Sequence, residues 1–169
     1  MDQPIVGLIL VVAGAVWAVR HRFFPPLPSP LPHGPDHPLL VESVLQARGS
    51  LERFRQLISE GSGQPIVKVA YATDTGSREH IWAELLRWEG EEIVIRYANV
   101  PVSQQGPMPS EESRVQADME DWAVVLPGGR LAGGFSQRAM LKMILEQQKE
   151  PSWGMRRRLK LEEARFVDA

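Results

Sequence analysis

His80 is the residue in the central part of the chain whose type best suits acid–base chemistry, because an imidazole ordinarily titrates near neutral pH. Glu79 comes directly before it, but adjacent side chains of a strand point to opposite faces, so the two do not easily form one acid–base pair. A hydrolase-like enzyme would combine His80 with a nearby carboxylate, either Asp121 or Glu79. The structural alternative is a histidine that bonds to backbone or to a neighbouring acid. We therefore assign no catalytic residue from the sequence.

Aromatic residues near these polar groups favour binding over catalysis. In an extended strand, Trp82 shares one face with His80, and a tryptophan beside a polar group suits a binding surface. Asp121 and Trp122 are adjacent and would pair an acid with an aromatic platform. The alternatives are that the tryptophans belong to the core and that Asp121 accepts hydrogen bonds in a turn.

Turn-forming residues mark the remaining candidate positions. Asn99 follows a predicted strand and comes two residues before Pro101. Its side chain is expected to form a hydrogen bond with nearby backbone. Gly133 and Gly134 lie between a predicted strand and helix but lack the spacing of a phosphate-binding loop, so a bulge or close backbone packing is their expected role. The candidate binding residues are Glu79, His80, Trp82, Asn99, Asp121, Trp122, Gly133 and Gly134.

Composition excludes several classes of site. The 169-residue chain has no cysteine, so disulfides, thiol catalysis and cysteine-based zinc sites are excluded. Its net charge of −2 gives no global attraction for nucleic acid. His33 and His37 form only a weak pair for a metal ion. We predict no metal, no cofactor and no nucleic-acid partner.

Two helical regions are expected around the candidate residues. Apolar residues recur at three- and four-residue steps from Leu40 to Ile58, which indicates an amphipathic helix. Gly49-Ser50 divides it into two shorter helices, with Ser50 as the cap of the second. A later helix is expected from a cap at Ser136 to about residue 149.

The segments between these helices alternate in the way that β-strands do. Strands are predicted at about 66–72, 79–88, 91–98, 115–119, 121–126 and 130–135. The fold class is therefore α+β, with an antiparallel sheet of five or six strands and helices on one face. Ile81, Ala83 and Leu85 are expected beneath the helices, which leaves His80, Trp82 and Trp88 on a more open face.

Four short motifs in a fixed order resemble a known bacterial family. They are Glu79-His80-Ile81-Trp82, Ala98-Asn99-Val100-Pro101, Asp121-Trp122 and the segment GGRLAGGF from Gly128 to Phe135. The series resembles the YegJ-like family, Domain of Unknown Function 2314, over about residues 42–147. A Gly-Asp step that is usual in the family is replaced here by residues 110–113. The resemblance implies a fold and a set of marked positions, but no reaction.

The N-terminal segment is expected to hold the chain in a membrane. Residues 4–19 carry no charge, which is typical of a short spanning helix. Arg20 and Arg22 follow it, so the positive-inside rule places the rest of the chain in the cytoplasm. A Gly14-x-x-x-Ala18 spacing would allow helix pairing and self-association. We predict a single-pass protein of the inner (cytoplasmic) membrane, and a cleaved signal peptide is the alternative.

The chain then divides into four parts. These are a membrane anchor (1–22), a proline-rich linker (23–38), a YegJ-like α+β domain (39–149) and a charged C-terminal tail (150–169). The linker favours an extended polyproline II spacer. The tail is expected to form a solvated helix with internal ion pairs, and contact with anionic lipid is the alternative.

The leading functional hypothesis is a membrane-anchored binding or interaction module. It would recognise an unknown protein or peptide partner through the aromatic-bearing face of the sheet. One alternative is a hydrolase-like enzyme that uses His80 with a nearby carboxylate. The other is a structural or accessory protein of the cell envelope.

Overall fold

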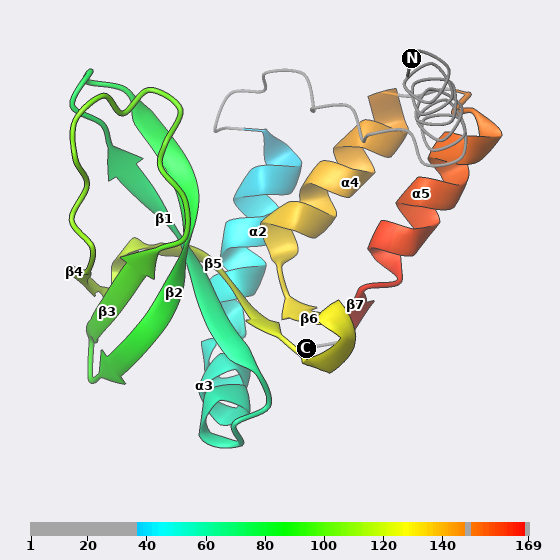
Figure 1. Cartoon of the computed structure of the whole chain (residues 1–169). Helices are drawn as coiled ribbons and strands as arrows, with labels where there is room; N and C mark the ends of the chain where they lie inside the picture. The colour runs from blue at the N-terminus through cyan, green and yellow to red at the C-terminus, as the bar shows by residue number, and fades with distance from the viewer. Residues whose placement is uncertain (1–36, 148–149, 168–169) are drawn as a thin grey trace, which may run out of the picture.

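Seven strands pair in the order β4-β3-β2-β1-β5-β6-β7 within the part of the chain that the computed structural model describes, residues 37–147 and 150–167 (Figure 1). Their bounds are β1 (Gln64–Ala72), β2 (Arg78–Glu89), β3 (Glu92–Tyr97), β4 (Glu112–Val115), β5 (Met119–Val125), β6 (Leu131–Gly133) and β7 (Phe166–Val167). The pairs are antiparallel except β6–β7, which is parallel. The fold is α+β as predicted, but the sheet is mixed and larger than the five or six antiparallel strands expected.

Four helices accompany this sheet in the described residues: α2 (Pro38–Gly49), α3 (Leu51–Ser59), α4 (Phe135–Gln147) and α5 (Trp153–Glu163). Helix α2 begins with a proline, and the side chain of His37 accepts a hydrogen bond from the Leu39 amide. The predicted break at Ser50 is confirmed. Its hydroxyl donates back to carbonyls of α2 and does not cap α3, contrary to expectation. Helices α2, α4 and α5 lie on one side of strands β1 to β4 (Figure 1).

The strand sequences are apolar at alternate positions because one face of the sheet is buried. Val67 pairs with Ala83, and both side chains are inaccessible to solvent. Ile81, Ala83 and Leu85 are buried, as predicted. On the opposite face His80 pairs with Ala70. Strand β1 therefore has one face in the core, and its other face carries the partly buried Lys68 and Ala70.

Aromatic residues join α3 to the sheet. The Phe54 ring stacks on the Trp122 ring at a centroid distance of 4.7 Å. The Phe54 ring also contacts the Trp88 ring, at a centroid distance of 5.6 Å. Each such pair contributes about 0.5–1.5 kcal/mol beyond the burial of apolar area. The buried Trp122 indole donates to the Ala47 carbonyl at 2.9 Å, so its polar atom is satisfied.

Trp88 lies on the core face because strand β2 contains a bulge. The register shifts between Leu85 and Arg87, so Leu86 is an extra residue without a partner. After the bulge the alternation is inverted, and Trp88 pairs with the buried Ile93. The expectation that Trp88 shares the open face with His80 is therefore wrong.

The strand predicted at 115–119 does not exist as one element. Strand β4 ends at Val115, a 3₁₀ turn spans Gln116–Asp118, and β5 begins at Met119. Strand β4 pairs with β3, whereas β5 pairs with β1 on the other side of the β1–β3 hairpin strands. The chain therefore crosses from one side of strands β1 to β3 to the other between β4 and β5. The alternation of apolar and polar side chains does not reveal this crossing.

Strand β7, which follows helix α5, is an edge strand of the sheet. Strand β7 pairs with β6, and the Arg138 guanidinium of α4 donates to the Val167 carbonyl at 2.5 Å.

The predicted anchor (4–19) and nearly all of the linker lie outside the described residues. Within residues 37–147 and 150–167, no helix has both the length and the apolar character needed to cross a membrane.

Candidate functional site

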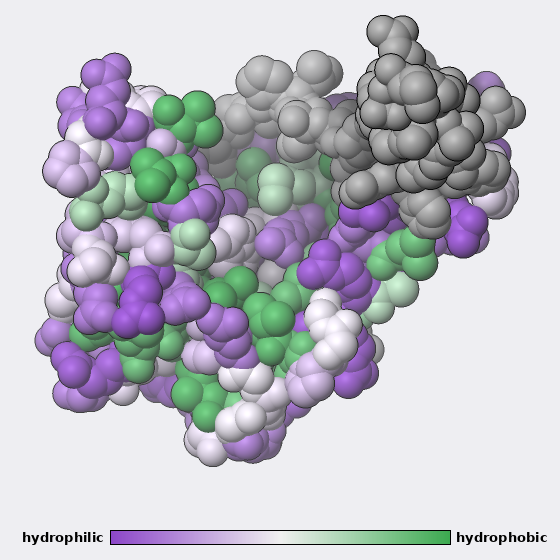
Figure 2. All heavy atoms as spheres, in the orientation of Figure 1, coloured by the Kyte–Doolittle hydropathy of each residue, from purple (hydrophilic) through white to green (hydrophobic). Residues whose placement is uncertain are grey.

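A groove lies between α2, the beginning of α4 and strands β1 and β2. Its volume is about 490 Å³, within the range of sites that bind small ligands. An apolar wall lines one side of it, formed by Leu40, Val41, Val44 and Leu45 of α2 and Met140 of α4. Figure 2 shows a hollow between the strands and the helices with hydrophobic residues inside it.

A polar cluster of Lys68, His80 and Glu120 faces this apolar wall. Nδ1 of His80 lies 2.6 Å from Oε2 of Glu120, which is a hydrogen bond between the imidazole and a carboxylate. The His80 side chain is 42% exposed, and its second ring nitrogen makes no hydrogen bond to the described part of the chain. Such a pair can orient the imidazole and fix which nitrogen carries the proton.

A bulge in β5 brings Glu120 to His80. Lys68 pairs with Asp121 and the next residue of β1 pairs with Met119, so Glu120 has no partner on β1. A β-bulge of this kind redirects a side chain that regular alternation would send to the other face. Sequence reasoning missed Glu120 for this reason, since in an unbroken strand it would point away from Asp121.

Lys68 extends from the middle of β1 beneath the same groove. Its Nζ lies 3.4 Å from Oγ of Ser136 and has no ion pair with another residue of the described chain. Burial lowers the pKa of its ammonium, although the nearby charges of Asp121 and Glu120 oppose that shift. Lys68 is the single charged residue in the apolar strand IVKVAYA, and that isolation is the sequence signal that could have identified it.

Asp121, in β5, caps the beginning of helix α4 and makes no hydrogen bond to His80. Its carboxylate accepts from the amides of Phe135 at 3.2 Å and Ser136 at 2.7 Å, and also from the Trp122 amide. The side chain is almost wholly buried, and this burial raises its pKa, while the hydrogen bonds act in the opposite direction. The predicted cap at Ser136 is therefore wrong: Ser136 lies inside α4, and Asp121 satisfies the first amides.

Glu79 is turned away from the groove and anchors the loop that follows β3. It accepts from the amides of Val102 and Ser103 and from the Ser103 hydroxyl. These hydrogen bonds, led by that of the hydroxyl, lower the pKa of Glu79. The loop also rests on Asp74, whose carboxylate accepts from the amide of Gln105 at 3.0 Å.

The other predicted residues divide between the sheet and the surface. Trp82 is half-buried and pairs with Lys68, so it lies beside the polar cluster without lining the groove. Asn99 is exposed, and its side chain makes no hydrogen bond to the described part of the chain. Trp122 is a core residue with no exposed surface. The structure thus brings His80, Trp82 and Asp121 near one another and leaves Asn99 outside.

The double glycine allows the chain to turn sharply from β6 into α4. Gly133 has φ of +82°, and a Cβ there would lie 2.5 Å from the Trp122 carbonyl oxygen and 2.6 Å from its ring. Gly134 also has a positive φ and donates its amide to the same carbonyl at 2.8 Å. Close backbone packing, expected from the sequence, is therefore the role seen at both glycines.

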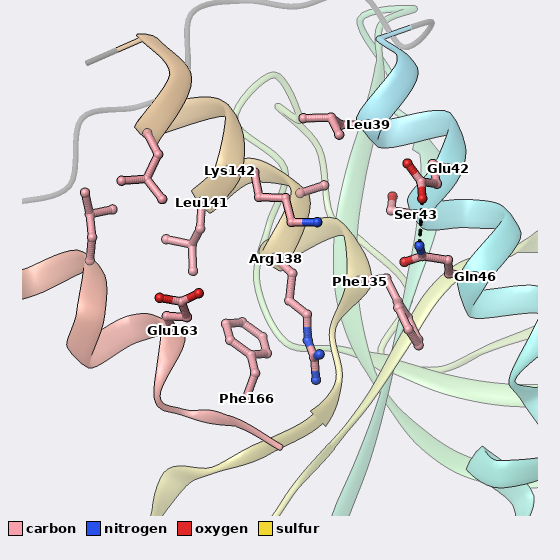
Figure 3. Close-up of a pocket in the computed structure, with 13 residues that line it drawn as sticks. Leu39, Glu42, Ser43, Gln46, Phe135, Arg138, Leu141, Lys142, Glu163 and Phe166 are labelled. Carbon is pink, nitrogen blue, oxygen red and sulfur yellow. Dashed lines mark hydrogen bonds between the residues drawn. The ribbon is translucent and has the colours of Figure 1, made fainter. Parts of the chain in front are cut away.

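A second cavity, of about 400 Å³, lies between α2, α4 and α5 (Figure 3). It contains charged groups from three helices, among them Glu42, Lys142 and Glu163. Arg138 points into it but is engaged with Phe166 and Val167 of the C-terminal segment. None of the eight candidate binding residues predicted from the sequence lines this cavity. Within residues 37–147 and 150–167, no group of three or more His, Asp or Glu side chains could hold a metal ion.

These features define the class of protein. It is an α+β domain with a mixed seven-stranded sheet and a groove that has an apolar wall on one side and a polar cluster on the other. The chain belongs to the DUF2314 family, described as an uncharacterized protein conserved in bacteria, whose model matches residues 41–155. The match includes the polar cluster and nearly all of the apolar wall. Searches of curated proteins and of solved structures gave no significant match.

Proposed function

We propose that the domain is a binding module, tethered to the inner membrane by residues 4–19, that takes up an apolar segment of a peptide or protein in the groove. The observation that carries the proposal is the placement of an apolar wall against a polar cluster in one cavity. Ligand sites commonly combine apolar walls, which supply affinity, with a few polar groups that fix orientation.

The apolar wall supports a peptide as the ligand because two of its five side chains, Val41 and Leu45, are exposed. Leu45 is 64% exposed and Val41 is also exposed, although both lie on a helix that packs against the sheet. Covering one such leucine contributes about 1.5–3 kcal/mol. The burial of two or three apolar side chains of a bound segment would therefore supply most of its binding free energy.

The polar cluster defines the second part of the ligand. Lys68 has donors that Ser136 does not use, and His80 has a second ring nitrogen beside its bond to Glu120. A peptide carbonyl or carboxylate would accept from Lys68. We therefore expect the bound segment to combine apolar side chains with a hydrogen-bond acceptor.

Peptide display against the full chain tests this proposal. We expect selection of apolar peptides whose affinity falls roughly tenfold or more with Leu45→Arg, since that change removes apolar contact area and adds a charge to the wall. The matched control is Val115→Arg, at a 54% exposed valine outside the groove, which should leave affinity unchanged. An absence of enriched peptides, or equal binding to both variants, would reject the proposal.

A hydrolase-like enzyme is the second candidate, and the 2.6 Å contact between His80 and Glu120 specifically favours it. The carboxylate would hold the imidazole as a general base toward water at the open nitrogen. Under this hypothesis the full chain hydrolyses simple aryl esters, and both His80→Ala and Glu120→Gln abolish the activity. Glu79→Gln is the control that retains it, because Glu79 serves the loop. Hydrolysis that is absent, or unchanged by both variants, excludes this alternative.

A further inference from the structure

Helix α5 has one face committed to the domain. Met155 and Leu159 are buried and pack against Ile144 and Leu141 of α4. Because residues three and four apart share a helix face, this packing fixes which side chains point outward. Helix α5 lies at the edge of the molecule beside α4 (Figure 1).

The outward face of α5 combines aromatic, aliphatic and basic side chains. Trp153 and Leu161 are 57% and 48% exposed, and Arg156, Arg157 and Lys160 lie between them at helical spacing. These five residues together line one shallow depression of the surface. We call them the α5 basic face.

The acidic residues of this helix lie elsewhere. Glu162 pairs with Arg158 at 2.7 Å and with Arg165 at 3.0 Å, away from the basic face. Glu163 lines the cavity between α2, α4 and α5 (Figure 3). Arg156 and Lys160 have no ion pair with any described residue. The ion pairs expected for the tail thus form on another side of α5, and no described residue compensates the charges of Arg156 and Lys160.

We propose that the α5 basic face lies on the surface of an anionic lipid bilayer. Trp153 and Leu161 would enter the boundary between head groups and acyl chains, and the basic residues would meet lipid phosphates. Each Lys or Arg near such a surface strengthens binding roughly fivefold. Nucleic acid is the less suitable polyanion, because the chain has a net charge of −2 and the apolar pair gains nothing on a phosphate backbone.

This proposal is independent of the groove and of residues 4–19, so the experiment has to report contact by α5 itself. The natural chain has no cysteine, which allows a single polarity-sensitive fluorophore to be attached at Ala164→Cys, an exposed position on the same side of α5. The control label is at Val102→Cys, in the loop after β3. The labelled full chains are reconstituted with vesicles of phosphatidylcholine alone or with added phosphatidylglycerol.

We expect the label at position 164 to report an apolar environment only when phosphatidylglycerol is present, and the label at position 102 to stay in water. Arg156→Gln with Lys160→Gln should abolish the shift, whereas Arg78→Gln with Arg87→Gln, two exposed arginines on β2, should retain it. High salt should weaken it. A shift of equal size on phosphatidylcholine, no shift, a shift that survives the α5 variant, or a shift with single-stranded RNA in place of vesicles would overturn the proposal.

Discussion

Single carboxylates in this domain have separate tasks that their sequence neighbours do not reveal. Glu79 and His80 are adjacent, yet Glu79 holds a loop while His80 faces a groove. Glu120 and Asp121 are also adjacent, yet Glu120 bonds to His80 while Asp121 starts a helix. The candidate site therefore depends on which face of a strand each acid occupies.

Glu79 gives a prediction for the dependence of stability on pH. Its folded-state pKa lies below the ordinary value of 4.5, so folding favours the ionised form. The stabilisation is present above pH 4.5 and is lost as the pH falls through the lower pKa of the folded state. Urea unfolding should show that Glu79→Gln is less stable than the wild type at neutral pH and that this difference shrinks under acid. Glu89→Gln, which changes an exposed acid paired with Arg87, should show no such convergence.

Gly133 gives a second prediction at this scale. Gly133→Ala would place a methyl group within 3 Å of the Trp122 backbone and ring, in addition to the cost of a positive φ. Gly128 also has a positive φ, of 78°, but has open space around it. We expect Gly128→Ala to lower the free energy of unfolding by about 1 kcal/mol, and Gly133→Ala by about 1–3 kcal/mol more. Equal losses in urea unfolding would show that close packing at Gly133 does not matter.

Helix α4 is positioned by a side chain from the middle of a strand. Asp121→Ala removes the acceptor for the Phe135 and Ser136 amides, so we expect a loss of about 3 kcal/mol or more in the free energy of unfolding. Asp121→Asn keeps one oxygen acceptor and should lose less. Asp118→Ala changes an exposed acid three residues away and is the control. A loss in Asp121→Ala no greater than in the control would contradict the role assigned to Asp121.

The sequence predicted elements better than it predicted their irregularities. The strands near 66–72, 79–88 and 91–98 follow from alternation, and the helix break at Ser50 follows from Gly49. The bulges in β2 and β5 leave no such pattern, because one extra residue inverts the faces without changing composition. Trp88 was therefore assigned to the wrong face, and Glu120 was overlooked as the partner of His80.

At the scale of the whole molecule, the groove and the α5 basic face lie on different elements. The groove is formed by α2, α4 and the sheet, whereas the basic face belongs to α5 alone. A module of this layout could rest on lipid through α5 and still present the groove to a partner. Strand β7, which follows α5, pairs with β6 in the sheet, and a parallel pairing between such distant segments is hard to foresee from the sequence.

The central claim is that the groove beside His80 is the binding site of this domain. An NMR titration of the full chain with the tightest peptide from the display selection tests it most directly. We predict that chemical-shift changes centre on Val44, Lys68, His80, Glu120 and Met140, and that Leu45→Arg removes them. Changes that centre instead on Glu42, Lys142 and Glu163 in the second cavity, or that survive Leu45→Arg, would contradict the claim.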